Sequence, residues 1–360
     1  PDAPRRLAYS LPMRVLVDQT VAQARKWIST LQLPVGVATL MGGEVEEQWE
    51  VYPERPYIIV GTQDMLLSRA LNRGYAMSRY RWPVHFGLLN NDCLWVCDEV
   101  QLMGDGLATS AQLAAFRESF QTFNKCPTIW MSATIDSRML HTVDLPDAPV
   151  TFELLEEDFA REDLNRRLTA RKDLEKAPDD CGTAPGLAHF LAERHRPATQ
   201  TIAVVNTVAR AREVFDNLRK LTGNDAACHL LHSRFRPLEK QRWAEIFESK
   251  IPSEGRVLVA TQVIEAGVDI SSSLLVTDLA PWPSMVQRFG RCNRAGEFDD
   301  AQVFWVDQRP KVEPYEAEEL ERAEGIVRDL KSASPSALPE HAPEYEPTHV
   351  LRRQDLVDLF

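Results

Sequence analysis

Long apolar runs are missing from this 360-residue chain, and so is a signal-peptide pattern at its start. A membrane-spanning helix needs about 20 consecutive apolar residues, and no stretch of the sequence approaches that length. Cysteine is scarce as well, because the six residues at 93, 97, 126, 181, 228 and 292 show the spacing of neither a disulfide framework nor a zinc site. These absences exclude a membrane protein and a disulfide-rich secreted domain. They predict a cytoplasmic protein with reduced cysteines.

Two dipeptides are also missing. Gly-Lys occurs nowhere, so the chain contains no G-x-x-x-x-G-K-[ST] loop of the kind that cradles nucleotide phosphates. No histidine is followed by aspartate, and the eight histidines are scattered. His229 and His232 are three residues apart on a predicted strand, where they would face opposite sides, so we do not expect a metal pair there.

The residues that are present describe a globular protein. Apolar residues make up 44% of the chain and charged residues 26%. The length is sufficient for two domains of ordinary size. The formal net charge of −12 excludes a surface that is basic throughout. A local groove of arginines can still bind nucleic acid in an acidic protein, so the charge does not identify a partner.

Predicted strands alternate with predicted helices along most of the chain. Apolar runs indicate strands at 5–12, 35–40, 57–60, 94–97, 128–131, 201–205, 227–231, 257–260, 274–276 and 301–306. This alternation predicts an α/β protein with parallel sheets. Because ligands bind such sheets at the carboxyl ends of the strands, polar residues that directly follow each strand are the candidates for function.

The alternation also predicts the domain organisation. We expect a first domain at 1–150, a charged linker at 151–185 and a second domain at 186–310. Residues 311–360 would form an acidic amphipathic helix and a proline-rich loop. We expect this last part to lead into a further C-terminal region that would supply its packing partners.

The most informative stretch lies between residues 256 and 296. A predicted buried strand ends in a polar Thr-Gln pair, and the pattern Q-R-x-G-R-x-x-R follows downstream. On a continuous helix, Gln287, Arg291 and Arg294 would share one face. Amide and guanidinium donors on one face are suited to a phosphate or a carboxylate.

A pair of acids follows the predicted strand at 94–97. Asp98 at this position can hold Mg²⁺ through water, and Glu99 can orient or deprotonate an attacking water. The next predicted strand is followed by Ser132-Ala133-Thr134. Either motif alone is weak, since surface turns and helix caps produce the same residues.

Taken together, the motifs resemble those of superfamily 2 helicases. A-T-Q-x-x-E-A-G-V-D-I followed by Q-R-x-G-R-x-x-R resembles motifs V and VI, C-D-E-V-Q resembles the DEAH-type box, and S-A-T resembles motif III. The resemblance implies two tandem RecA-like domains that use ATP and Mg²⁺. It also implies that the first domain is truncated at its N-terminus, upstream of which the missing phosphate loop would lie.

The same resemblance implies a role for each motif residue. Catalysis is assigned to Asp98, Glu99, Gln287, Arg291 and Arg294, and the last two resemble arginine fingers that reach the γ-phosphate. Nucleotide binding is assigned to Asp98, Gly267, Asp269, Arg288, Arg291 and Arg294, with Asp98 as the indirect Mg²⁺ ligand. Contacts to a nucleic-acid backbone are assigned to Ser10, Pro12, Arg14, Thr62, Asn206, Thr207, His232, Thr261 and Gln262. Coupling between hydrolysis and nucleic-acid binding is assigned to Gln101, Ser132 and Thr134.

Longer phrases narrow the resemblance further. YSLPMRVLVDQT, VGTQDMLLSRAL, CDEVQLMG and PWPSMVQRFGRCNRAG are similar to the CRISPR-associated helicase–nuclease of type I interference systems, most of all to subtype I-U, or I-G. This implies an antiviral motor that joins an RNA-guided surveillance complex and unwinds target DNA along the displaced single strand of the R-loop. Family members carry an HD nuclease domain, which the histidines of this chain do not provide.

Two other functions remain open. The chain could be a generic superfamily 2 helicase of DNA repair or RNA metabolism, which strand polarity and stimulation by DNA rather than RNA would distinguish. It could also act only as a nucleic-acid-binding module, because it lacks the phosphate loop. DNA binding without hydrolysis would favour that second alternative.

Overall fold

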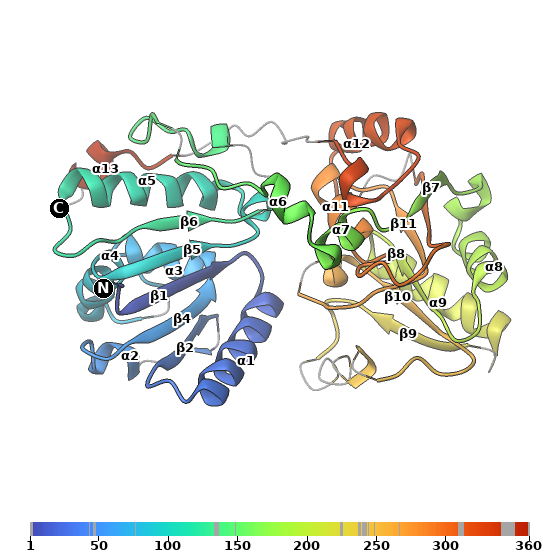
Figure 1. Ribbon diagram of the computed structural model, residues 1–360, viewed down its shortest axis with the longest axis horizontal. Helices are drawn as coiled ribbons and strands as arrows, with labels where there is room; N and C mark the ends of the chain where they lie inside the picture. The colour runs from blue at the N-terminus through green and yellow to red at the C-terminus, as the bar shows by residue number, and fades with distance from the viewer. Residues whose placement is uncertain are drawn as a thin grey trace. The chain divides into compact units, whose positions relative to one another are not determined.

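The computed structural model describes residues 3–358 except 43, 46–47, 76, 133–136, 148, 224–225, 237–238, 240–242, 244, 248, 266, 309–312 and 340–349. The chain divides into two compact units (Figure 1). Unit 1 comprises Pro1–Phe152 and His341–Phe360, and unit 2 comprises Glu153–Glu340.

Unit 1 is built on a six-stranded sheet in the order β3-β2-β4-β1-β5-β6. Its strands are β1 (Arg6–Leu11), β2 (Gly36–Met41), β3 (Glu44–Val45), β4 (Tyr57–Thr62), β5 (Cys93–Cys97) and β6 (Thr128–Trp130). All pairs are parallel except β2 with β3. The carboxyl ends of the parallel strands therefore lie along one edge of the sheet.

Helices cover both faces of this sheet. The described helices are α1 (Arg14–Leu31), α2 (Gln48–Val51), α3 (Gln63–Ala70), α4 (Trp82–Asn90), α5 (Asp105–Phe120) and α13 (Arg353–Asp358), with short 3₁₀ turns η1 (Arg79–Arg81), η2 (Val100–Leu102) and η3 (Ser137–Leu140). On one face, α1 packs through Val17 and Val21 against β1, β2 and β4. The larger core on the other face is formed with α3, α4 and α5.

Unit 2 contains a second six-stranded sheet, in the order β7-β12-β11-β8-β10-β9. Its strands are β7 (Asp173–Lys176), β8 (Gln200–Val204), β9 (Ala227–Leu231), β10 (Arg256–Ala260), β11 (Leu274–Asp278) and β12 (Gln302–Val306), and all their pairs are parallel. Every residue of β8, β10 and β11 is buried, as expected for the central strands of a sheet with helices on both faces.

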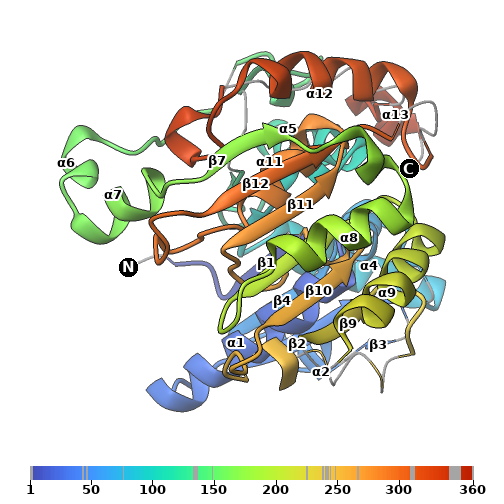
Figure 2. The same ribbon diagram turned by 90° about the vertical axis from the view of Figure 1, so that its right-hand side faces the viewer.

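The two faces of the second sheet have separate cores. Helices α8 (Ala184–Arg194) and α9 (Val208–Thr222) cover one face (Figure 2). Helices α11 (Trp282–Phe289) and α12 (Ala317–Asp329) pack on the other. The remaining elements are α6 (Glu156–Phe159), α7 (Glu162–Leu168), η4 (Asp179–Gly182), η5 (Gln262–Ile264) and η6 (Pro335–Ala337).

The two parallel sheets confirm the predicted α/β class, and each of the ten predicted strands lies within about two residues of an observed one. The apolar runs were reliable signals because strands buried on both faces must be apolar throughout. The helix predicted from about 237 to 249 lies largely outside the described residues. None of the described helices is long and apolar enough to cross a bilayer.

Two segments differ from the predicted organisation. The stretch 151–185, expected to be a linker, contributes strand β7, which pairs with β12 at the edge of the unit 2 sheet. Its charged residues concealed the strand because only one β7 side chain, Leu174, is buried among described core residues. The segment 311–360 also finds partners within the chain: α12 packs on the unit 2 core through Leu320 and Val327, and α13 on the unit 1 core through Leu356.

The packing of α13 can be tested by truncating one side chain. Leu356 is 8% exposed in the unit 1 core, whereas its neighbour Val357 is 51% exposed. Leu356→Ala should lower the free energy of unfolding of unit 1 by about 2 kcal/mol, because it removes buried apolar contacts and leaves a cavity. Hydrogen exchange of the β5 amides under increasing urea measures this loss. Val357→Ala is the matched control, and equal effects of the two variants would contradict the packing of α13.

Candidate functional site

The acid pair lies at the carboxyl end of β5, as predicted. The Asp98 backbone N–H donates to the Ser10 carbonyl oxygen at 3.0 Å, which holds the turn against β1. Asp98 Oδ2 accepts from the Tyr9 hydroxyl at 2.8 Å, and Oδ1 accepts from the Glu99 N–H at 2.9 Å. Burial and the neighbouring Asp98 carboxylate raise the pKa of Tyr9 well above its usual range, so Tyr9 remains a donor. The orientation of Asp98 is therefore fixed before any ligand arrives.

A short relay connects the acid pair to the segment after β6. The Gln101 amide donates through Nε2 to Glu99 Oε2 at 2.5 Å and accepts at Oε1 from the Ser132 hydroxyl at 2.6 Å. Glu99 has a φ of 52°, a left-handed conformation that non-glycine residues adopt only when their surroundings require it. Gln101 thus physically joins the two motifs assigned to coupling. Thr134, the third residue of that assignment, lies outside the described residues.

The nucleic-acid contacts assigned to unit 1 are only partly accessible. Arg14 is exposed in the first turn of α1, and Pro12 is half-buried just before it. Ser10 is fully buried within β1, and Thr62 is 8% exposed at the end of β4. The Ser10 side chain is therefore not accessible in this structure, and its assignment to nucleic acid stays a prediction.

Unit 2 is organised at its strand ends by Arg288, which is fully buried. Arg288 Nε donates to Glu265 Oε1 at 2.7 Å, and Nη2 donates to the Tyr315 hydroxyl at 3.2 Å. Nη1 donates to Asn206 Oδ1, Thr277 Oγ1 and the Asp278 carbonyl oxygen at 3.1, 3.0 and 2.9 Å. No face of its guanidinium reaches solvent in this structure, and the assignment of Arg288 to the nucleotide stays a prediction.

Asn206 belongs to the same network. Its Nδ2 donates to the Leu279 carbonyl oxygen at 2.8 Å, and its backbone N–H donates to Asp278 Oδ2 at 3.1 Å. It is 6% exposed, and Thr261 is 2% exposed. Both side chains are buried in this structure, and their assignment to nucleic acid stays a prediction. Thr207 is half-buried and caps α9 by accepting from the Arg210 N–H at 3.2 Å.

Tyr315 is a member of this network that sequence reasoning missed. Its hydroxyl accepts from Gln262 Nε2 at 3.2 Å as well as from Arg288, so it joins the segments that resemble motifs V and VI. Gln262 Nε2 also donates to the Asn206 carbonyl oxygen at 2.9 Å. The sequence around Tyr315 gives no sign of this role, because Tyr315 belongs to no motif and lies in the segment between β12 and α12. It meets its partners only in the folded unit.

Asp278 was missed as well, although its position at the end of β11 follows the strand-end rule. It is 1% exposed and forms an ion pair with Arg210, whose Nε lies 3.1 Å from Oδ2. Burial raises the pKa of Asp278, and the Arg210 guanidinium opposes that rise. The pair lines a hollow of about 410 Å³ beside Thr207 and the start of α8.

The predicted arginine face does not form, because α11 ends at Phe289. Gly290 caps the helix, Asn293 has a φ of 45°, and Cys292 forms a bridge with Ser272 instead of a further helical turn. Gln287 is half-buried within the helix, while Arg291 and Arg294 lie beyond it. The prediction that these three residues share one helix face is therefore wrong.

The two arginines beyond α11 have different surroundings. Arg291 is 5% exposed and donates through Nε and Nη2 to the carbonyl oxygens of Ile264 and Glu265, at 2.8 and 2.6 Å. The side chain of Arg294 is 48% exposed, and its Nε lies 3.2 Å from Oδ1 of Asp269, itself 92% exposed. Gly267, two residues before that aspartate, has a φ of 76° that favours glycine.

His232 is 8% exposed, and its ring stacks on Phe235 with centroids 4.3 Å apart. Burial lowers its pKa. The ring is therefore stacked and buried in this structure, and its assignment to nucleic acid stays a prediction. Across the described residues, no group of three or more His, Cys, Asp or Glu side chains is arranged to hold a metal ion. Asp98 still fits an indirect Mg²⁺ contact, because carboxylate oxygens that already accept one hydrogen bond can accept another from metal-bound water.

Lys172 hydrogen-bonds the C-terminal end of α11. It is 2% exposed, and its Nζ donates to the Phe289 carbonyl oxygen at 3.1 Å, at the last residue of α11. Burial lowers its pKa from 10.5 to about 8. A buried cation at a helix C-terminus satisfies an orphan carbonyl but is costly to keep charged.

The lowered pKa of Lys172 predicts a pH dependence of stability. Between about pH 8 and 10.5 the unfolded state binds more protons at this lysine than the folded state does, so stability should rise with pH across that window. The difference in free energy of unfolding between the natural chain and Lys172→Met should move by about 1–3 kcal/mol in favour of the natural chain. Urea unfolding at several pH values measures it, and a difference that stays constant with pH would contradict the burial of the lysine.

The Arg288 network predicts a large loss of stability for one arginine and a negligible loss for another. Arg288→Met should lower the free energy of unfolding of unit 2 by about 3–5 kcal/mol, because Glu265 is left buried without its cation. Arg294→Met, whose partner is exposed, should change it by less than about 1 kcal/mol. Hydrogen exchange of the β8 and β11 amides under increasing urea reports on unit 2 alone. Similar effects for both arginines would refute the structural role of Arg288.

Comparisons with known families agree with the two units. A DEAD/DEAH box helicase family model matches residues 2–143, and the model of the C-terminal part of CRISPR-associated nuclease/helicase Cas3 matches residues 198–297. The CRISPR-associated nuclease/helicase Cas3 of Haloferax volcanii is 40% identical over 100 residues, which cover 27% of this chain and 11% of that protein. The CRISPR-associated helicase Cas3 of Thermoproteus tenax is 34% identical over 114 residues, which cover 31% and 19%.

Solved structures show the same fold. The chain matches a crystal structure of T. fusca Cas3-ATP with a TM-score of 0.66 and 18% identity, over 98% of this chain and 46% of that one. A CRISPR RNA-guided surveillance complex in a pre-nicking state contains a chain that matches with a TM-score of 0.58 and 20% identity, over 98% and 45%. This chain thus spans about half the length of the structures it matches. The parallel sheets of units 1 and 2 have the fold of tandem RecA-like domains. The two family models and the relatives together place the chain in the family of CRISPR-associated superfamily 2 helicases.

Proposed function

We propose that this helicase core hydrolyses ATP to move along single-stranded DNA and unwinds target DNA in CRISPR antiviral interference. The observation that carries the proposal is the relay from Glu99 through Gln101 to Ser132. In a motor, a change at the nucleotide must reach the surface that holds nucleic acid. A glutamine that bonds both a catalytic acid and a serine of the neighbouring strand end is suited to transmit it.

In this proposal the acid pair acts on the nucleotide. Asp98, fixed by Tyr9 and by the Glu99 N–H, would hold Mg²⁺ through water. The bound metal would neutralise the charge that develops on the transferred phosphoryl group. Glu99 would orient the attacking water and accept its proton, and the Gln101 N–H would keep the carboxylate aimed.

Arg294 and Arg291 would stabilise the phosphate charge. Arg294 is suited to it because an exposed ion pair such as Arg294–Asp269 contributes little, so the arginine can exchange its partner for a phosphate. Arg291 would contribute through the turn at Ile264 and Glu265, whose carbonyl oxygens it holds. Gln287 and Gly267 would complete this side of the site.

The proposed DNA-binding surfaces consist of the accessible residues among those assigned to nucleic-acid contacts. Arg14, Pro12, Thr207 and Gln262 are exposed or half-buried at strand ends, where a phosphate backbone can approach donors and helix N-termini. Such contacts position the strand without reading its sequence. We propose the displaced strand of an R-loop as the substrate and an RNA-guided surveillance complex as the recruiting partner. We also propose that the protein acts in the cytoplasm and is most similar to subtype I-U, or I-G.

Two observations support alternative functions, a nucleic-acid-binding module and a general helicase. The sequence contains no phosphate loop, so the chain by itself could bind nucleic acid without hydrolysis. A DNA-bound DUF1998 helicase, MrfA, also matches the fold with a TM-score of 0.58 and 14% identity. A general superfamily 2 helicase would be stimulated by DNA without any surveillance complex.

DNA-stimulated ATP hydrolysis tests the proposal. The chain is compared with a version that carries a phosphate-binding loop and its strand ahead of Pro1. In the active version, Arg294→Ala should reduce turnover about 10³–10⁵-fold, as removal of an arginine finger does. Gln101→Leu, which removes both bonds of the relay, should abolish the stimulation of hydrolysis by single-stranded DNA and should lower basal turnover less than Arg294→Ala does.

Arg322→Ala is the matched control, since Arg322 is exposed on α12 and away from every strand end. If the extended version binds DNA but does not hydrolyse ATP, the motor function is refuted and a nucleic-acid-binding module remains. Full DNA stimulation in Gln101→Leu would refute the relay alone.

A further inference from the structure

The loop between α3 and α4 contains no acidic residue. Its described residues, 71–75 and 77–81, belong to the longest stretch of the chain without aspartate or glutamate, which runs from Met65 to Asn91. That stretch contains four arginines, in a chain whose formal net charge is −12. The α3–α4 loop therefore has the opposite sign of charge to the chain as a whole, which favours an anionic partner.

Side-chain contacts hold this loop against the neighbouring helices. Trp82 Nε1, in the first turn of α4, donates to the Gly74 carbonyl oxygen at 3.1 Å. At the other end of the loop, Arg81 forms an ion pair with Glu50 of α2. The loop is thus anchored to α2 and α4 before any partner binds, so a partner does not have to order its backbone.

Two tyrosines are exposed on this anchored loop. Tyr75 is 61% exposed, and Tyr80 is 93% exposed. Single exposed aromatic residues are ordinary on protein surfaces, but two so close together on a fixed backbone form a preorganised contact area. Because a tyrosine side chain has only two rotatable bonds, placing its ring against a partner costs little conformational entropy.

Arginines accompany the two tyrosines. Arg79 is exposed, and its Cζ lies 5.9 Å from the centroid of the Trp82 ring. Arg73 is exposed as well, with its Cζ 5.5 Å from the same ring centroid. Trp82 therefore keeps two guanidinium groups in the loop that carries Tyr75 and Tyr80, where they can donate to phosphate oxygens.

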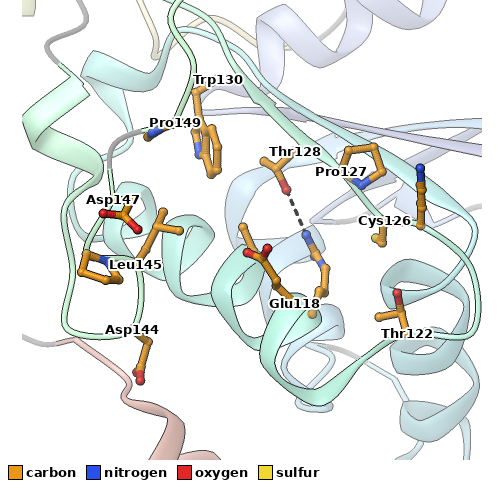
Figure 3. A pocket seen from close by; sticks show the side chains of 14 residues that line it. Glu118, Thr122, Cys126, Pro127, Thr128, Trp130, Asp144, Leu145, Asp147 and Pro149 are labelled. Carbon is orange, nitrogen blue, oxygen red and sulfur yellow. Dashed lines mark hydrogen bonds between the residues drawn. The ribbon is translucent and has the colours of Figure 1, made fainter.

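Another exposed ring and cation of unit 1 have acidic surroundings. A cavity of about 620 Å³ beside β6 has walls that include Lys125 and three acids, Glu118, Asp144 and Asp147 (Figure 3). Phe123, two residues before Lys125, is 92% exposed. Because carboxylates repel a phosphate backbone, this region lacks the charge that would attract nucleic acid. It supplies matched controls for the α3–α4 loop.

We propose that the α3–α4 loop is a contact surface for single-stranded nucleic acid. Bases stack on the rings of Tyr75 and Tyr80, and Arg73 and Arg79 contact the phosphates that link these bases. A single strand fits better than a duplex, because its bases are free to leave their own stack and lie on a tyrosine. None of these four residues belongs to a helicase motif. The surface therefore does not depend on whether the chain hydrolyses ATP.

Photo-crosslinking without ATP locates the contact. The folded chain is irradiated with oligothymidylate, and the crosslinked residues are identified by peptide mass spectrometry. Crosslinks should map to Tyr75 or Tyr80, and unlabelled oligothymidylate should compete for them better than duplex DNA does. Crosslinks confined to the strand-end residues of the proposed motor would overturn this surface and leave the motor untouched. Crosslinks confined to the loop would support the surface and count against the strand-end DNA contacts.

Variants test stacking and charge separately, with binding of labelled oligothymidylate measured by fluorescence anisotropy. Tyr80→Ala should weaken binding about 5–100-fold, whereas Tyr80→Phe keeps the ring and should preserve it. Arg79→Ala should make the dependence of log affinity on log salt concentration shallower by about 0.7. Phe123→Ala and Lys125→Ala, the matched controls, should leave the affinity unchanged. Equal affinities of Tyr80→Ala and Phe123→Ala would refute the surface.

Discussion

The strand ends of unit 2 depend on the burial of one guanidinium. Arg288 has no exposed surface, and its donors connect α11 to the ends of β8 and β11, to η5 and to the segment before α12. A buried arginine is tolerated only when every donor is satisfied and its charge is matched, here by Glu265. This requirement fixes five segments at once, and it leaves little freedom for the loops that carry the motif residues.

The same constraint separates structural from functional arginines in the Q-R-x-G-R-x-x-R pattern. Arg288 organises the core, Arg291 holds the turn after η5, and Arg294 alone is substantially exposed, with an exposed partner. An exposed charge can change its partner at little cost, whereas a charge whose donors are all bonded inside the core cannot. The pattern therefore contains arginines, three residues apart, whose burial and hydrogen-bond partners differ.

The constraint in unit 1 is different, because Asp98 and Glu99 must stay in contact with water and still be held in one orientation. Tyr9 and a backbone N–H fix Asp98, while Gln101 aims Glu99 and reaches across to Ser132. Each contact comes from a strand end adjacent in the sheet order β1-β5-β6. The relay is short because parallel strands bring their carboxyl ends to one edge.

The sequence alone determined the strands, their alternation with helices, the place of Asp98 and Glu99, and the helicase family, because buried parallel strands are apolar and the motifs follow their ends. Tertiary structure decided what single positions do. Ser10 and Asn206 are buried, the helix at 282–289 stops before Arg291, and the charged 173–176 segment pairs as an edge strand. Tyr315 acquires its partners only through contacts distant in sequence. Local patterns record which face is apolar, but burial and hydrogen-bond partners depend on what the rest of the chain places beside a residue.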